Sequence, residues 1–152
     1  MTLVRVGTSQ IDRQGLFAAT DIPQGTRIIE YLGEKITKCE SARRLANYNT
    51  YIFHFDYQHD IDGATLANTA RYINHSCAPN CAVEYTTETI WIVAIKDIQV
   101  GEELSFNYGY DARDYAKFPC HCGAKNCCGY ILGREYWGLI PAQPPQALAS
   151  GQ

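Results

Sequence analysis

The sequence is 152 residues long, which fits one domain of the usual size of roughly 100–200 residues. Hydrophobic residues make up 46% of the chain and charged residues 19%, a balance that excludes a largely disordered protein. The 13 basic and 16 acidic residues leave a net charge of −3, so no basic excess points to nucleic acid as a direct partner.

Short β-type runs occupy residues 3–6 and 27–32, and Pro23-Gln24-Gly25 marks a turn between them. Residues 51–57 alternate, and a strand there would place four aromatic side chains on one face: Tyr51, Phe53, Phe55 and Tyr57. A hydrophobic run over 89–95 predicts a strand that is buried on both faces. Residues 104–108 predict a further strand.

Helices are expected to be few and short. Thr37 and Glu40 fit a capping box at the start of a helix that continues through 41–46. Asn68 is expected to cap a helical turn over 70–73. Short strands broken by turns, with so few helices, indicate a mainly β domain.

Two features indicate where the protein acts. No apolar run reaches the roughly 18 residues that cross a membrane, and the N-terminus lacks the apolar stretch of a signal peptide. Seven cysteines are fewer than a disulfide scaffold of this length would carry, so they favour a metal site in a reducing compartment. We expect an intracellular protein with no membrane partner, in the cytoplasm, in the nucleus or as an effector in a host nucleus. The oligomeric state is open.

Three cysteines fall close together as C-x-C-x4-C, at Cys120, Cys122 and Cys127. Three thiolates on one tight loop can converge on a zinc ion, which takes four tetrahedral ligands when it is structural. Unliganded buried thiols are the alternative interpretation. Spacing alone leaves five candidates for the fourth ligand: Cys39, Cys77, Cys81, Cys128 and His121.

Polar and aromatic residues suggest a pocket elsewhere. The run 74–77 (Asn-His-Ser-Cys) can form a polar pocket floor or an ordinary capped turn. A catalytic nucleophile there is disfavoured, because neighbours in sequence seldom face each other. Phe118 and Trp137 flank the cysteine cluster, either as a lid over a ligand or as packing for the tail.

Four blocks, at residues 15–34, 71–81, 101–108 and 120–127, resemble the signatures of SET-domain protein lysine methyltransferases. They stand in the family's order and cover roughly residues 5–132. The first block departs from the family's Gly-x-Gly pattern, since Arg13 stands at the first glycine. The segment 38–49, which often helps to select the substrate, is short.

The resemblance implies a fold of several small β-sheets with a C-terminal pseudoknot, in which the segment around Tyr108 passes under the loop at 74–76. It divides the chain into a SET domain over 1–117, a post-SET zinc-binding segment over 118–137 and a tail over 138–152, which we expect to be disordered. It also implies two cofactors, S-adenosylmethionine and Zn²⁺.

The resemblance assigns roles to single residues. Tyr108 corresponds to the active-site tyrosine, Tyr51 to a second channel tyrosine, and Phe106 to the position that tunes how many methyl groups are added. Cys77 would be the fourth zinc ligand, with Cys120, Cys122 and Cys127. The donor would be bound by a larger set: Gln14, Gly15, Leu16, Arg71, Asn74, His75, Tyr108 and Phe118.

These assignments predict a protein lysine N-methyltransferase that acts on a histone tail or another basic protein. Phe106 has no hydroxyl to crowd a methylated amine, so we expect di- or trimethylation. The alternative is a catalytically inactive SET fold that binds a peptide. Retention of Tyr108, Asn74, His75 and Tyr51 argues against it, and the missing first glycine is its support.

Overall fold

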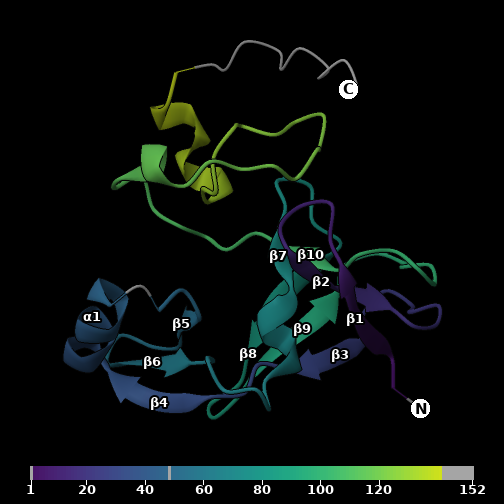
Figure 1. The fold of residues 1–152 in the computed structure, drawn as a ribbon, viewed down its shortest axis with the longest axis horizontal. Coiled ribbons are helices and arrows are strands. Elements are labelled where there is room, and N and C mark those ends of the chain that lie inside the picture. Colours follow the sequence, from purple (N-terminus) through teal and green to yellow (C-terminus); the bar gives the residue numbers. More distant parts are fainter. Residues whose placement is uncertain (1, 48, 142–152) are drawn as a thin grey trace.

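The computed structural model describes residues 2–47 and 49–141, and the predicted disorder of 142–152 lies outside them. The described chain forms small sheets with few helices, which confirms the mainly β prediction (Figure 1). Three sheets are antiparallel: β1 (Val4–Thr8) with β2 (Gln14–Ala18); β3 (Arg27–Glu30), β9 (Ile90–Ala94) and β8 (Cys81–Tyr85); and β4 (Glu34–Thr37), β6 (His59–Asp62) and β5 (Ile52–His54). The helices are α1 (Lys38–Ala46) and three 3-10 turns, η1 (Thr69–Tyr72), η2 (Tyr115–Lys117) and η3 (Arg134–Leu139).

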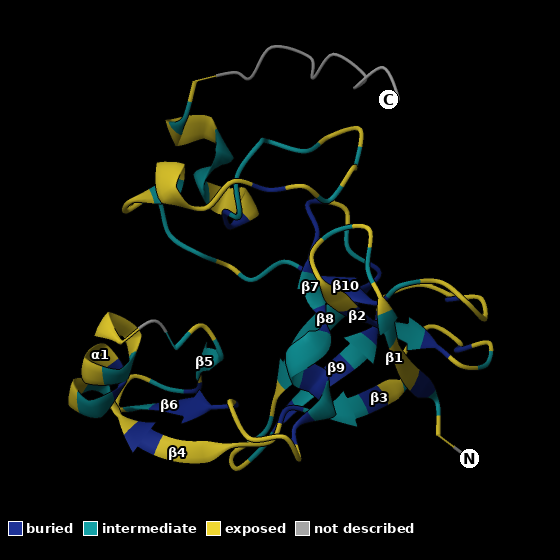
Figure 2. Cartoon of the chain, in the orientation of Figure 1, coloured by how far each residue is buried: buried dark blue, intermediate teal, exposed yellow. Residues whose placement is uncertain are grey.

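The core lies where β2, β9 and β10 (Ser105–Phe106) meet, as the dark blue segments of Figure 2 show. β9 sits between β3 and β8, with Ile90, Ile92 and Ala94 buried. Trp91 and Val93 are only half-buried. The prediction of burial on both faces was therefore wrong, because only one face of this sheet packs on the core.

The fourth sheet is a parallel pair that brings distant segments together. β7 (Asn74–His75) pairs with β10 (Ser105–Phe106), so Asn74 lies opposite Ser105 and His75 opposite Phe106. Beyond the pair, the backbone N–H of Ser76 donates to the Phe106 carbonyl at 3.2 Å. The predicted pseudoknot requires these contacts, which place the segment before Tyr108 beside the loop at 74–76.

The predicted helix start is partly confirmed. The Thr37 hydroxyl accepts from the backbone N–H of Glu40 at 3.2 Å. The Glu40 carboxylate does not complete the capping box, because it accepts from the guanidinium groups of Arg43 and Arg44 instead. A single side-chain cap is enough to begin the helix.

The predicted strand over 51–57 is shorter than expected. It ends at His54, because the Asp56 carboxylate accepts from the backbone N–H groups of Gln58 and His59 at 2.8 and 2.7 Å and turns the chain into β6. Tyr57 is consequently 84% exposed and does not share a buried face with Phe53 and Phe55.

Asn68 does precede a helical turn, but its side chain does not cap it. The amide is fully buried and bridges two other segments. Its Oδ1 accepts from the Leu32 N–H at 3.0 Å, and its Nδ2 donates to the Gly63 carbonyl at 3.1 Å. Asn68 therefore ties the segments that follow β3 and β6 to the start of η1.

The segment 118–137 holds no strand of a named sheet and lies above the sheets in Figure 1. The body holds it through the Gly133 N–H, which donates to the Tyr110 carbonyl at 2.8 Å, and through Asn107 Nδ2, which donates to the Leu132 carbonyl at 3.2 Å. The ordered chain continues past 137, since η3 ends at Leu139. Within residues 2–47 and 49–141, no helix is long and apolar enough to cross a membrane.

Candidate active site

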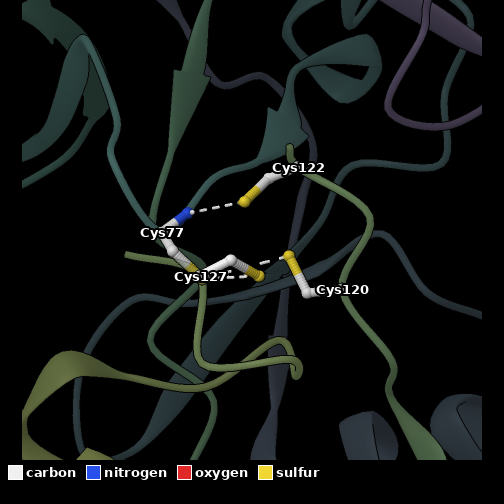
Figure 3. A group of neighbouring side chains, drawn as sticks. All are labelled: Cys77, Cys120, Cys122 and Cys127. Atoms are coloured by element: carbon white, nitrogen blue, oxygen red, sulfur yellow. Dashed lines mark hydrogen bonds between the residues drawn. The ribbon is translucent and has the colours of Figure 1, made fainter. Parts of the chain in front are cut away.

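Four cysteine thiols converge at the junction of the 118–137 segment and the body (Figure 3). The sulfur atoms of Cys77, Cys120, Cys122 and Cys127 all lie within 4.8 Å of one another. Cys77 Sγ is 3.7 Å from Cys127 Sγ and 4.0 Å from Cys120 Sγ. Sulfur ligands of a tetrahedral zinc lie about 3.8 Å apart, given Zn–S bonds of about 2.3 Å. The four thiols therefore fit one zinc ion.

Spacing left five candidates for the fourth ligand, and the fold places Cys77 beside the triplet. Cys39 is exposed on α1, and the Cys128 thiol donates to the Tyr130 carbonyl at 3.2 Å. Without an ion, the hydrogen bond with Cys120 and burial raise the pKa of the Cys77 thiol. A divalent cation would offset that effect, because it binds thiolates.

His75 lies between the cysteine cluster and Tyr108. Its Nδ1 accepts from the Tyr108 backbone N–H at 3.0 Å, and its Nε2 is 3.7 Å from Cys77 Sγ. Burial lowers the pKa of His75 to about 4, so the ring is neutral at pH 7. Because Nδ1 accepts, the proton is on Nε2 and faces the sulfur. His75 thus joins a zinc-site cysteine to the backbone at Tyr108.

Tyr108 is held by its hydroxyl, which donates to the Ile73 carbonyl at 2.7 Å. Burial raises the pKa of this phenol, so the phenol remains protonated at neutral pH. Its ring centroid lies 5.0 Å from that of Phe106 and 5.8 Å from that of Tyr110. A row of aromatic rings with centroids 4.7–5.8 Å apart runs through it: Tyr31, Phe53, Phe106, Tyr108, Tyr110 and Phe118.

Tyr51 lies beside this row but is held differently. Its carbonyl accepts from the Tyr31 hydroxyl at 2.8 Å, and the Arg71 guanidinium lies 4.4 Å from its ring centroid. Arg71 Nη1 donates to the Ala64 carbonyl at 2.5 Å. Nε of Arg71 is buried and finds no hydrogen-bond partner within the described part of the chain. Arg71 is therefore held between the Tyr51 ring and the Ala64 carbonyl.

A cavity of about 200 Å³ lies against Tyr108 on the side of the cysteine cluster. Three residues assigned to the donor from the resemblance line it: Asn74, His75 and Tyr108. Sequence reasoning did not assign the other lining residues to the donor, because their positions depend on how two segments dock: Ile11, Asp12, Pro119, Cys120, His121 and Ile131.

The remaining donor assignments lie around or away from this cavity. The Gln14 carbonyl accepts from Asn74 Nδ2 at 3.0 Å. Leu16 is fully buried in the core, and its carbonyl accepts from the Leu104 N–H at 2.8 Å. Phe118 packs edge-on against Tyr110 and is 40% exposed, next to the cavity residue Pro119.

Comparison with known proteins gives this arrangement a family. Residues 13–109 match the SET domain. The chain belongs to the SET-domain family. It is 40% identical over 134 residues to Histone-lysine N-methyltransferase 2D of Homo sapiens, a match that covers 82% of this chain and 2% of that protein. It is 38% identical over 135 residues to the H3 lysine-4 specific histone-lysine N-methyltransferase of Schizosaccharomyces pombe, with coverages of 82% and 15%. The chain thus spans only a small part of these relatives.

Solved structures agree with the family. A structure of ctPRC2 in an autoinhibited conformation bound to S-adenosylmethionine matches with a TM-score of 0.64 and 39% identity. This match covers 71% of the present chain and 15% of that one. The SET fold with its small sheets is therefore shown for this chain.

The departure from the family's first glycine has a structural consequence. Arg13 adopts a φ of 43°, in the left-handed region where a side chain is disfavoured and glycine is not. The backbone here keeps the conformation that suits a glycine although the residue is arginine. Its guanidinium is solvent-exposed, 3.9 Å from the Asp12 carboxylate.

Proposed function

We propose that this SET domain is an S-adenosylmethionine-dependent protein lysine N-methyltransferase. The observation that carries the proposal is the position of Tyr108, which lines the cavity and also stands in the aromatic row. Methyl transfer needs the donor on one side of this phenol and a lysine, in an apolar channel, on the other. The names of the relatives, which are histone-lysine methyltransferases, support the same activity.

The donor would occupy the cavity beside Tyr108. S-adenosylmethionine supplies a methyl group on a cationic sulfonium. Asn74 Oδ1 accepts no hydrogen bond from the described residues, which leaves it available for an ammonium group, and the Asp12 carboxylate lines the same cavity. A cavity of about 200 Å³ is below the roughly 300–1,000 Å³ of typical ligand pockets, so we expect the donor to extend out of it.

The lysine would enter along the aromatic row. The attacking amine must be neutral, and deprotonating a lysine of pKa ~10.4 near pH 7.4 costs about 4 kcal/mol. Apolar walls and a neighbouring cation both lower an amine's pKa, so Phe106 and the flanking rings contribute by excluding water. Tyr108 serves to position the amine and not as a strong base, since its phenol holds its proton.

We further propose that the products are di- and trimethyllysine. Phe106 is buried between the rings of Phe53 and Tyr108, at centroid distances of 5.6 and 5.0 Å. A tyrosine hydroxyl at this position would occupy space beside the amine and hold a water there. Phenylalanine leaves that space for a methylated amine to rotate back into line.

Zinc at the four cysteines would fasten the 118–137 segment over the cavity. A histone tail is the substrate that we propose, because the relatives are named for histone lysines, and with it we propose a nuclear location. Another basic protein is the alternative substrate. An inactive peptide-binding SET domain is the alternative function. The observation that favours it is the left-handed backbone conformation of Arg13, in the loop at 9–13 beside the cavity.

The test uses labelled S-adenosylmethionine with core histones and with a total protein lysate. We expect label on lysine with the wild type and a loss of at least about 100-fold with Tyr108→Phe, the size of effect that follows removal of one preorganised hydrogen-bonding group from an active site. Tyr57→Phe, which alters an exposed phenol, is the matched control and should retain full activity. The absence of both donor binding and transfer to any protein would support the inactive module instead.

A further inference from the structure

A carboxylate outside the cavity, that of Glu103, connects the loop at 9–13 to the loop at 74–76. Glu103 follows the turn at Gly101, and its Oε1 accepts from the Ser9 hydroxyl at 2.7 Å and from Asn74 Nδ2 at 3.0 Å. The three residues come from segments that are 29 to 94 positions apart. Hydrogen bonds to a carboxylate are stronger than those between neutral groups, so the bonds to Glu103 contribute most to holding these segments together.

The bonds to Glu103 fix two walls of the cavity. Ser9 Oγ gives its proton to Glu103 and accepts from the backbone N–H groups of Ile11 and Asp12, at 2.9 and 3.2 Å. Ile11 and Asp12 both line the cavity. The Ser9 N–H also donates to the Arg13 carbonyl at 3.0 Å, which closes the loop over residues 9–13.

The same bonds determine which way the Asn74 amide faces. Four oxygen atoms surround its Nδ2 at 3.0–3.1 Å: Ser9 Oγ, the carbonyls of Asp12 and Gln14, and Glu103 Oε1. An amide nitrogen that is surrounded by acceptors must point its N–H groups at them. Asn74 Oδ1 is therefore left for a ligand.

Gly15 has a role here that its backbone angles do not explain. It is absent from the glycines of positive φ, so it is not needed for a left-handed conformation. A Cβ at this position would overlap Oε1 of Glu103 and lie 2.9 Å from its Cδ, closer than real Cβ atoms approach, and it would make a tight contact of 3.1 Å with Cβ of Ser9. Glycine at 15 makes room for the carboxylate.

We propose that Glu103 is a positioning residue for the methyl donor and that Gly15 exists to accommodate it. Glu103 does not line the cavity, and it acts by holding the loop at 9–13 and the Asn74 amide in their donor-binding arrangement. The role of this pair in donor binding rests on the proposed function, but its role in holding the loop does not.

The experiment compares four zinc-loaded variants with the wild type: Glu103→Ala, Glu103→Gln, Gly15→Ala and the double variant Gly15→Ala/Glu103→Ala. Glu102→Ala removes the adjacent carboxylate, which bonds the Gln99 N–H, and is the matched control. Three quantities are measured: donor dissociation constant, substrate KM, and amide hydrogen exchange at Ile11 and Asp12 without donor. Thermal unfolding and zinc content verify that each variant is folded.

For Glu103→Ala we expect donor affinity to fall at least about tenfold, which corresponds to the loss of one charge-assisted hydrogen bond. Amide exchange at residues 11 and 12 should rise, and substrate KM should stay unchanged. Glu103→Gln, which keeps an acceptor oxygen, should recover part of the affinity. Gly15→Ala should weaken donor binding in the wild type but add little to Glu103→Ala, because the alanine then has room.

Unchanged donor affinity and loop exchange in Glu103→Ala would overturn the proposal, as would fully additive effects in the double variant. Equal losses in Glu102→Ala would also overturn it, since they would show a general effect of charge. A wild type that binds no donor would refute the proposed function. The exchange measurement would then still decide whether Glu103 and Gly15 hold the loop.

Discussion

Removal of zinc from the four-cysteine site is expected to weaken donor binding while the three antiparallel sheets stay folded. Four of the nine residues that line the cavity belong to the segment that zinc would fasten: Pro119, Cys120, His121 and Ile131. No strand of a named sheet lies in this segment, and the core residues that hold the sheets together come from elsewhere in the chain. The metal should therefore act locally.

The magnitude follows from the contacts that would be lost. Pro119 and Ile131 are the apolar members of that wall. If each contributes about 1 kcal/mol of apolar contact with the donor, their loss costs about 2 kcal/mol. A loss of 2 kcal/mol corresponds to a roughly 30-fold weaker dissociation constant.

The assay is calorimetric titration of the donor before and after treatment with a chelator, with zinc content measured in the same samples. Far-UV circular dichroism follows the sheets. Cys127→Ser should reproduce the effect of chelation, and Cys39→Ser, at an exposed thiol outside the cluster, should not. Unchanged donor affinity after complete zinc removal would refute the reasoning. Loss of the sheet signal on chelation would show instead that the metal holds the whole fold.

Three further substitutions test separate parts of the account. Arg13→Gly removes a side chain from a left-handed backbone position and should raise the free energy of unfolding by about 0.5–1 kcal/mol in urea titrations, with tighter donor binding. Asp114→Gly, at a φ of 53°, is the control, and it should raise the free energy of unfolding less and leave donor binding unaffected. A destabilised Arg13→Gly would contradict this reasoning. Phe106→Tyr should shift the products toward monomethyllysine by mass spectrometry, and an unchanged distribution would count against the role of Phe106. Asn68→Ala leaves the Leu32 N–H and the Gly63 carbonyl without their partner and should cost about 2–3 kcal/mol in the same titrations; a cost below about 0.5 kcal/mol would exclude a structural role for the bridge.

Local signals in the sequence predicted the parts of the fold that local forces determine. The apolar run of β9 and the Thr37 cap are examples, since hydrophobic pattern and a side-chain hydrogen bond act over a few residues. β6 gave no such signal, because its Asp60 and Asp62 are buried against Lys38 and Arg44 from the helix, and only the tertiary fold supplies those partners.

The candidate site divides in the same way. The spacing of Cys120, Cys122 and Cys127 pointed to a metal, but Cys77 lies 43 residues before Cys120, and spacing could not select it. The resemblance to a family assigned Cys77 and Tyr108. Glu103 stands in the block at 101–108, but neither source assigned it a role, because its contacts depend on the docking of three segments that are far apart in the chain.

The measurement that tests the central claim most directly is the mass of core histones after incubation with zinc-loaded protein and a deuterated-methyl donor. The account predicts added methyl groups on lysine, two or three per modified site, and none with Tyr108→Phe. Bound donor with no mass change on histones or on any protein of a lysate would contradict it, and so would methylation that persists in full in Tyr108→Phe.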